Sequence, residues 1–279
     1  MTGGAKPRVR LTSLLRVEER LAEAGYFARR MFDLPNSTVL GYELNAFLSA
    51  ARSVTFLLQK EFAAVDGFGA CWNTERAKLG ADEAARFFLD LRNFSQKEGR
   101  VSVVGASDQG GKWRYMFAGT EDRVPAVLLN RDVADCCLEH LAKLAQSILR
   151  VAEAFPYQCC PTQALTPAGV AALGLDLDAV ETALGFSPAI SAARPEGSIE
   201  ERTRLYRRYV DPVDFDEIRR ISDYSPMPPM QRGDDFGIAL GLSMVEQIES
   251  SRDAAMSHDD AVRIALATEV LRMRRDSGD

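Results

Sequence analysis

Apolar residues recur every three or four positions along most of the first half of the chain. Over residues 14–31 this spacing forms a single apolar stripe, which predicts an amphipathic helix that starts at Thr12 or Ser13 and stops before Pro35. Residues 39–63 repeat the spacing but are apolar on nearly every face, which is typical of a central, buried helix. Residues 132–155 again carry one apolar face and predict a third long helix.

Between the second and third of these helices the pattern changes twice. The segment from residue 66 to residue 80 reads as a loop and a short helix, and Asp82 is a good cap for a helix that ends at Gly99. In "RVSVVG" and "KWRYMFAG" apolar and polar residues then alternate, and the turn-forming "ASDQGG" stands between them. Residues 101–118 are therefore expected to form a β-hairpin.

Together these elements predict a mainly α protein, in which a helical bundle with up-down connections carries one inserted β-hairpin. We place the bundle at residues 10–158 and a helical C-terminal region at residues 165–279, packed on the bundle or standing beside it. Proline-rich "PYQCCPTQALTPAG" is the expected linker. The C-terminal region is expected to hold short helices near 168–184, 198–209 and 214–222, then two longer ones near 238–255 and 258–275.

Composition narrows the class of protein without naming a function. Of 279 residues, 46% are hydrophobic and 27% charged, as in ordinary globular proteins, and no apolar run approaches the length of a membrane span. A cytoplasmic protein with reduced cysteines is expected. Residues 1–160 contain 21 basic and 19 acidic side chains, whereas residues 161–279 contain 13 and 21. The first half is therefore the more suitable for binding a polyanion.

One constellation of polar residues stands out within the predicted core helices. Arg92 and Asn93 lie late in an apolar helix, and Lys97 follows Asn93 by one turn. The central helix carries a second polar stripe, made of Asn45, Ser49 and Arg52. A guanidinium is a planar fork of donors that suits phosphate, so the two stripes together predict a cleft that holds a phosphodiester. The alternative is structural: Arg92 and Arg52 would balance buried carboxylates such as Glu43 or Asp90.

The stretches "YELNAFLSAARSVTFLLQKEF" and "RFFLDLRNFSQKEG" resemble the HEPN superfamily of nucleotide- and RNA-binding helical bundles, over residues 10–160. In that family four to six residues separate an arginine from a following histidine, and the pair supports metal-independent RNA cleavage. Arg92 and Asn93 match this motif, but Lys97 occupies the position of the histidine. Because lysine titrates near 10.4, it binds phosphate well and is a poor base at neutral pH. The resemblance thus implies a member that has lost its proton shuttle.

Three functions follow as hypotheses. The first is a non-catalytic module that binds RNA, a nucleotide or a protein partner, with the bacterial stress response or phage defence as the context that the resemblance implies. The second is a ribonuclease that uses Arg92, Asn93 and Lys97, and the third is a scaffold that acts through its C-terminal helices. The resemblance also implies a two-fold homodimer. No cofactor and no membrane contact is expected. No metal is expected either, because Cys136 and His140 have a zinc-like spacing but lack two plausible further ligands.

Overall fold

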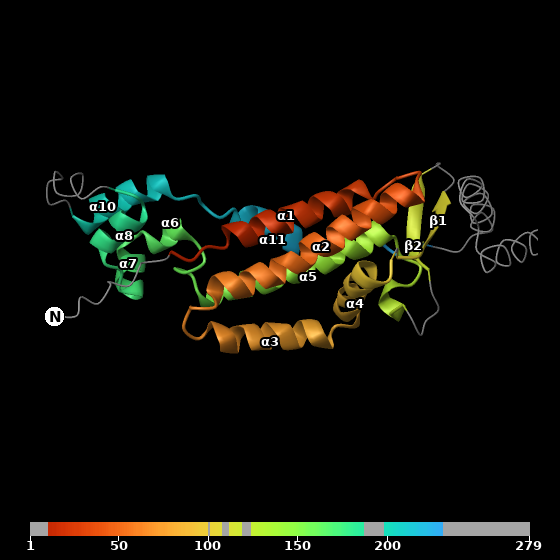
Figure 1. The fold of residues 1–279 in the computed structure, drawn as a ribbon, viewed down its shortest axis with the longest axis horizontal. Helices are drawn as coiled ribbons and strands as arrows, with labels where there is room; N and C mark the ends of the chain where they lie inside the picture. Colours follow the sequence, from red (N-terminus) through yellow and green to blue (C-terminus); the bar gives the residue numbers. More distant parts are fainter. Residues whose placement is uncertain (1–10, 100, 108–111, 119–123, 187–197, 231–279) are drawn as a thin grey trace, which may run out of the picture.

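A computed structural model describes residues 11–99, 101–107, 112–118, 124–186 and 198–230. Within them the protein is mainly helical, with one two-stranded antiparallel sheet. Three long helices lie side by side and form the body of the molecule: α1 (Leu15–Arg30), α2 (Ser37–Phe62) and α5 (Val133–Ala154) (Figure 1). A cluster of short helices stands at one end of this body and the hairpin at the other.

The bundle is held together by an apolar core to which each of the long helices contributes. Leu21 of α1, Phe47 of α2 and Leu141 of α5 are all fully buried in the same hydrophobic cluster. Burying such side chains contributes about 1.5–3 kcal/mol each. The three-to-four spacing of apolar residues is thus realised as the contact face of each helix, as the sequence predicts.

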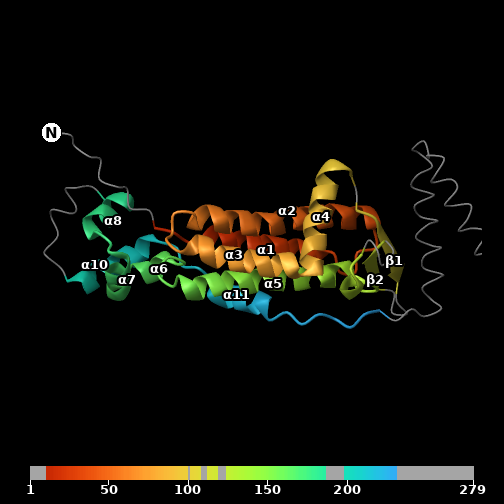
Figure 2. The same cartoon turned by 90° about the horizontal axis from the view of Figure 1, so that it is seen from below.

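Two further helices cover one side of the bundle. Helix α3 (Phe68–Ala81) follows the left-handed Gly67, and α4 (Glu83–Lys97) crosses α2 steeply near the hairpin end (Figure 2). Asp82 caps α4, as predicted, by accepting a hydrogen bond from the Ala85 N–H at 2.9 Å. The helix expected in the segment 66–80 is present as α3, but it is longer than predicted, with 14 residues.

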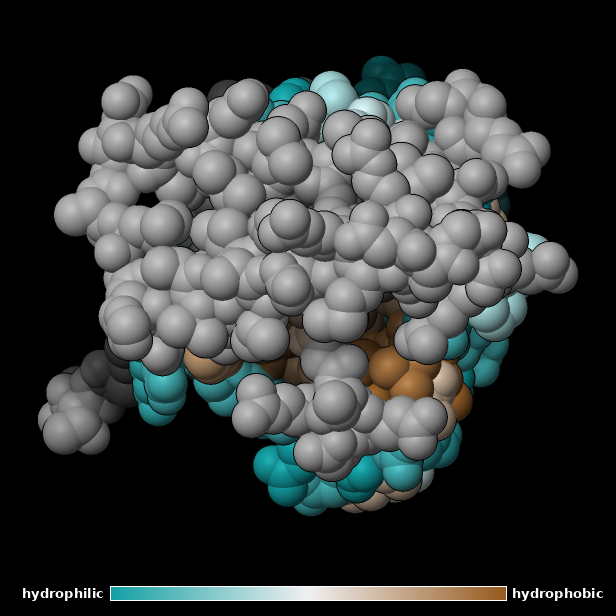
Figure 3. Space-filling view, turned by 90° about the vertical axis from the view of Figure 1, so that its right-hand side faces the viewer, coloured by the Kyte–Doolittle hydropathy of each residue, from teal (hydrophilic) through white to brown (hydrophobic). Residues whose placement is uncertain are grey.

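The expected hairpin is present as β1 (Val103–Ser107) and β2 (Trp113–Phe117). Val103 pairs with Phe117, and Gly105 pairs with Tyr115. A Cβ atom at Gly105 would lie 2.6 Å from the ring of Tyr115, so this strand position requires glycine. The one-turn 3₁₀ helix η1 (Ala126–Leu128) then leads into α5. Figure 3 shows hydrophobic surface at this end of the molecule, beside patches of hydrophilic residues.

The C-terminal region divides between two hydrophobic clusters. Short helices α6 (Pro161–Ala164), α7 (Pro167–Leu173), α8 (Leu177–Ala183) and α10 (Ile199–Tyr206), with the 3₁₀ turn η2 (Arg207–Tyr209), surround a small core of their own. Helix α11 (Phe215–Ser222) instead contributes Ile218 and Ile221 to the core of the bundle. The C-terminal region is therefore partly packed on the bundle.

Local hydrogen bonds fix several of the helix ends. The capping box of Ser198 and Glu201 is present, and Asn36 caps α2. Helix α1 begins one to two residues later than predicted, with Leu14 at the cap position, although the Ser13 hydroxyl accepts a hydrogen bond from the Leu15 N–H. The single helix expected near 168–184 is two helices, because Gly174 adopts a left-handed conformation (φ 58°) between α7 and α8. The helices expected at 238–255 and 258–275 lie outside the described residues.

Candidate functional site

Helices α2, α3, α4 and α5 enclose a cleft of about 310 Å³. Four arginines line it: Arg52 from α2, Arg76 from α3, and Arg86 and Arg92 from α4. Among the described residues that line the cleft there is no aspartate or glutamate. The rest of the lining is largely apolar, with Leu48, Ala51, Leu79, Phe88, Leu89 and Leu144 among its members. The cleft therefore combines an apolar interior with positive charge and no compensating carboxylate of its own.

The walls of the cleft are attached to α5 by ion pairs. Glu75 of α3 is buried and pairs with Arg150 of α5 at 2.7 Å and with Lys78 at 2.6 Å. At the junction of α3 and α4, Asp82 pairs with Lys143 of α5 at 2.7 Å. Burial opposes ionisation of Glu75 and Asp82, but the hydrogen bonds from their cationic partners prevail and lower the pKa of both carboxyls. Both carboxylates therefore stay charged at neutral pH and fix the two walls.

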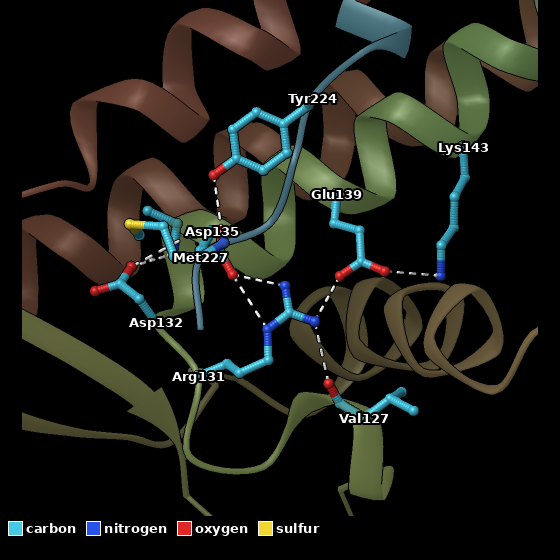
Figure 4. A network of polar contacts seen from close by, with 9 residues as sticks. Val127, Arg131, Asp132, Asp135, Glu139, Lys143, Tyr224 and Met227 are labelled. Carbon is cyan, nitrogen blue, oxygen red and sulfur yellow. Dashed lines mark hydrogen bonds and ion pairs between the residues drawn. The ribbon is translucent and has the colours of Figure 1, made fainter. Parts of the chain in front are cut away.

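A longer polar network runs along α5 as far as Lys143 (Figure 4), and the ion pair of Lys143 connects this network to Asp82. Its centre is Asp135, which is 1% exposed and accepts hydrogen bonds from Arg131, from the Tyr224 hydroxyl at 2.8 Å and from the Met227 N–H at 2.7 Å. Arg131 reaches Glu139, and Lys143 joins Glu139 to Asp82 at 3.3 and 2.7 Å. The segment that follows α11 is thus tied to α5 by the same network that supports the start of α4.

His140 lies in the cleft, where it stacks on Phe88 with ring centroids 4.5 Å apart. Burial, reinforced by the positive charge of Lys143, lowers the pKa of this imidazole to about 4. The ring is therefore neutral at physiological pH. Its Nδ1 atom is buried and has no hydrogen-bond partner among the described residues.

Two other buried nitrogen atoms in the cleft lack a partner in the described part of the chain. They are Nε1 of Trp72, a side chain that is 6% exposed, and Nε of Arg92. Both atoms carry a hydrogen and can only donate. Native proteins pair the great majority of such groups, so three unpaired nitrogens, counting His140 Nδ1, in one cleft are a feature that calls for an explanation.

Of the six predicted site residues, two line the cleft and four do not. Arg92 and Arg52 line the same cleft, as the two polar stripes predicted. The carboxylates proposed as their structural partners are not paired with them: Glu43 pairs with Arg30 at 2.8 Å, and neither Arg52 nor Arg92 has an ion pair among the described residues. Among the described residues, Arg52 donates to the hydroxyl of Thr55, and Arg92 donates to the side-chain oxygen of its neighbour Asn93 at 3.3 Å.

The remaining candidates do not line the cleft. Lys97 is exposed at the last turn of α4, and Asn45 and Asn93 are half-buried. Ser49 lies on another face of α2 and lines a separate depression together with Arg20 and Phe56. The sequence reasoning also missed four members of the cleft: Trp72, Arg76, Arg86 and His140.

The surroundings of Cys136 and His140 do not support a zinc site at these two residues. Cys136 is 1% exposed, and burial raises the pKa of its thiol to about 12, so that it remains protonated at neutral pH. In the described ranges no group of three or more metal-binding side chains comes together. Among the helices that are described, none has both the length and the apolar composition needed to cross a membrane.

Comparison of the chain with protein-family models, with curated proteins and with solved structures found no match. The functional argument therefore depends on the cleft itself.

Proposed function

We propose that this chain is a non-catalytic, HEPN-like helical module whose cleft binds a phosphate-bearing ligand, either RNA or a nucleotide, in bacterial stress response or phage defence. The observation that carries the proposal is the set of four arginines that line one cleft, with no carboxylate among the described residues of its lining. Arginine forks match phosphate oxygens in geometry and in charge. An apolar interior next to such a fork is suited to a base attached to the phosphate.

Exposed arginines are often hydrated without binding any ligand, so the phosphate site has to be tested by removing positive charge at the cleft. Arg52 and Arg86 are the appropriate targets, because both are exposed and neither forms an ion pair in the described structure. In the double variant Arg52→Ala/Arg86→Ala, each lost charge-assisted contact should cost about 1.5–3 kcal/mol of binding free energy, or roughly ten- to a hundredfold in affinity.

The measurement is fluorescence anisotropy with a labelled mononucleotide and a labelled short RNA, at about 50 and about 200 mM salt. Arg219→Ala is the matched control, because Arg219 is an exposed arginine on α11, away from the cleft. The proposal requires that the double variant loses affinity and that Arg219→Ala does not. If both variants bind as the wild-type protein does, the cleft is not the binding site.

The same experiments can also favour one of two other functions. RNA cleavage that resists EDTA and disappears in Lys97→Ala would favour the ribonuclease, with Lys97 acting as an acid or a charge stabiliser. Absence of both binding and cleavage would favour a scaffold that acts through its C-terminal helices. Two observations argue against the ribonuclease. Lys97 is exposed and lies outside the cleft lining, and His140 is neutral at physiological pH.

A further inference from the structure

Two residues that line the cleft carry hydrogen-bond donors without a partner in the described part of the chain. Trp72 Nε1 and Arg92 Nε are both buried, both line the cleft, and neither has an acceptor among the described residues. Leaving a buried donor unpaired is unfavourable, because its hydration is lost and no hydrogen bond replaces it. These donors are therefore stabilised when a ligand brings acceptor atoms into the cleft.

Arg92 presents a defined edge to such a ligand. Its Nη1 atom donates to Asn93, which leaves Nε and Nη2, two donors that point in nearly the same direction. Arg131 shows how this edge works elsewhere in the molecule, since its Nε and Nη2 donate to one oxygen of Asp135 at 3.1 and 2.6 Å. The Nε and Nη2 edge of Arg92 can in the same way hold one acceptor atom, or two acceptor atoms placed side by side.

The other side chains that line the cleft restrict the kind of ligand that can bring acceptor atoms to these donors. The stacked rings of Phe88 and His140 and the side chains of Leu48 and Leu144 make this part of the lining apolar and in part flat. An alkyl chain would fill it but would leave the donors unpaired, and a fully charged group would lose its hydration there. A neutral heteroaromatic ring with two adjacent acceptors satisfies both conditions. Guanine has such an edge in O6 and N7, whereas adenine has an acceptor beside a donor.

Size and charge favour a free nucleotide over a polymer. A cleft of about 310 Å³ is at the lower end of the range for small-molecule sites. The whole chain has a formal net charge of −6, which opposes the approach of a long polyanion. The exposed Arg52, Arg76 and Arg86 supply local charge for one phosphate group near the apolar interior.

We propose that the cleft selects a free guanine mononucleotide, with the Nε and Nη2 edge of Arg92 on O6 and N7 of the base, Trp72 Nε1 donating to a further acceptor of the ligand, and the exposed arginines on the phosphate. This inference rests on the proposed function, that the cleft binds a phosphate-bearing ligand. It adds the identity of the base and the preference for a monomer.

Calorimetric titration of the full chain with single compounds tests each part. One good bidentate contact gives about 1–3 kcal/mol of discrimination, so GMP should bind roughly five- to a hundredfold more tightly than AMP. Inosine monophosphate keeps O6 and N7 and should bind like GMP, whereas 7-deaza-GMP lacks N7 and should bind like AMP. A short single-stranded RNA should bind more weakly than GMP.

Two conservative variants connect the preference to the named donors. Arg92→Lys keeps the positive charge and removes the paired donors, so GMP and AMP should bind equally. Trp72→Phe keeps an aromatic ring and removes the N–H, so GMP should bind several-fold more weakly. Arg219→Lys is the control, and thermal unfolding establishes that each variant is folded.

The outcomes separate this inference from the proposed function. Equal binding of GMP and AMP by the wild-type protein, weakened in Arg52→Ala/Arg86→Ala, overturns the selection of guanine and leaves the phosphate site standing. Tighter binding of the RNA than of GMP overturns the preference for a mononucleotide in the same way. If GMP, AMP, inorganic phosphate and RNA all fail to bind, both proposals are wrong.

Discussion

Replacing His140 by phenylalanine should make the stability of the protein less sensitive to mild acid. The imidazole stacks on Phe88 and its pKa is lowered to about 4, chiefly by burial, from an ordinary value of 6.5. Between these two values the unfolded chain binds a proton at His140 and the folded protein does not. Because the unfolded state takes up more protons, the free energy of unfolding falls as the pH falls through this window.

The size of the effect follows from the two pKa values. One pKa unit corresponds to about 1.4 kcal/mol, so His140 should lower the stability of the wild-type protein by about 2 kcal/mol between pH 7.5 and pH 5. Phenylalanine keeps a flat ring against Phe88 but does not titrate. The difference in unfolding free energy between the wild-type protein and His140→Phe should therefore move by that amount in favour of the variant.

Urea unfolding followed by circular dichroism at several pH values between about 7.5 and 5 measures this difference. Carboxyl groups that both proteins share, and His258, contribute equally and cancel when the two curves are subtracted. A difference that stays constant to within about 0.5 kcal/mol over this range would refute the reasoning, because single-site comparisons resolve changes of that size. It would mean that His140 takes up a proton as readily in the folded protein as in the unfolded chain.

Three further predictions concern other parts of the molecule. Tyr224→Phe removes the hydroxyl that donates to Asp135 and should lower the free energy of unfolding by about 0.5–1.5 kcal/mol, whereas Tyr209→Phe, at an exposed side chain, should change little in the same urea titration. Gly169→Ala would place a Cβ atom 2.4 Å from the carbonyl oxygen of Gln163, so it should destabilise the cluster of short helices by about 1–3 kcal/mol. In circular dichroism, the helical signal of the variant should therefore be lost at a lower temperature than that of the wild-type protein. By the HEPN resemblance, sedimentation equilibrium at micromolar concentration should give twice the chain mass of 30.7 kDa, and a monomer would contradict this expectation.

Elements whose signals are local were accessible from the sequence. The apolar stripes of α1, α2 and α5 identify their buried faces, and the caps at Asp82 and Ser198 use side chains within three residues of their partners. Such signals require no knowledge of what the element packs against. For the same reason the hairpin was found from its alternation and its turn residues.

Helix α3 was underestimated because its buried positions do not form an apolar stripe. Of its fourteen residues only Phe68, Trp72 and Glu75 are buried, and the last of these is a charged side chain. Glu75 becomes a buried residue through Arg150, which lies 75 positions later in the chain. A contact between residues so far apart in sequence leaves no periodic trace in either segment.

The candidate site was predicted in part for a related reason. Arg52 and Arg92 interrupt apolar helices, and this local irregularity identified them. His140 stood out in the sequence only for its spacing to Cys136, and Trp72 lies in a segment that reads as a loop and a short helix. Only the packing of α3 and α5 around α4 brings these two residues into the cleft. Ser49 was grouped with Arg52 because the two lie three residues apart, yet they line different depressions on α2.

Helix geometry also explains why Lys97 does not line the cleft beside Arg92. An α-helix turns by about 100° per residue, so a residue five positions after Arg92 is displaced from it by about 140° around the helix axis. In agreement with this, Arg92 lines the cleft while Lys97 is exposed at the end of α4. The one imidazole in the cleft comes from α5, where burial holds it neutral. A positively charged lining with a neutral imidazole favours holding an anion over transferring a proton to or from it. The chemistry of this cleft therefore depends on His140 and the arginines, and much less on the residue at position 97.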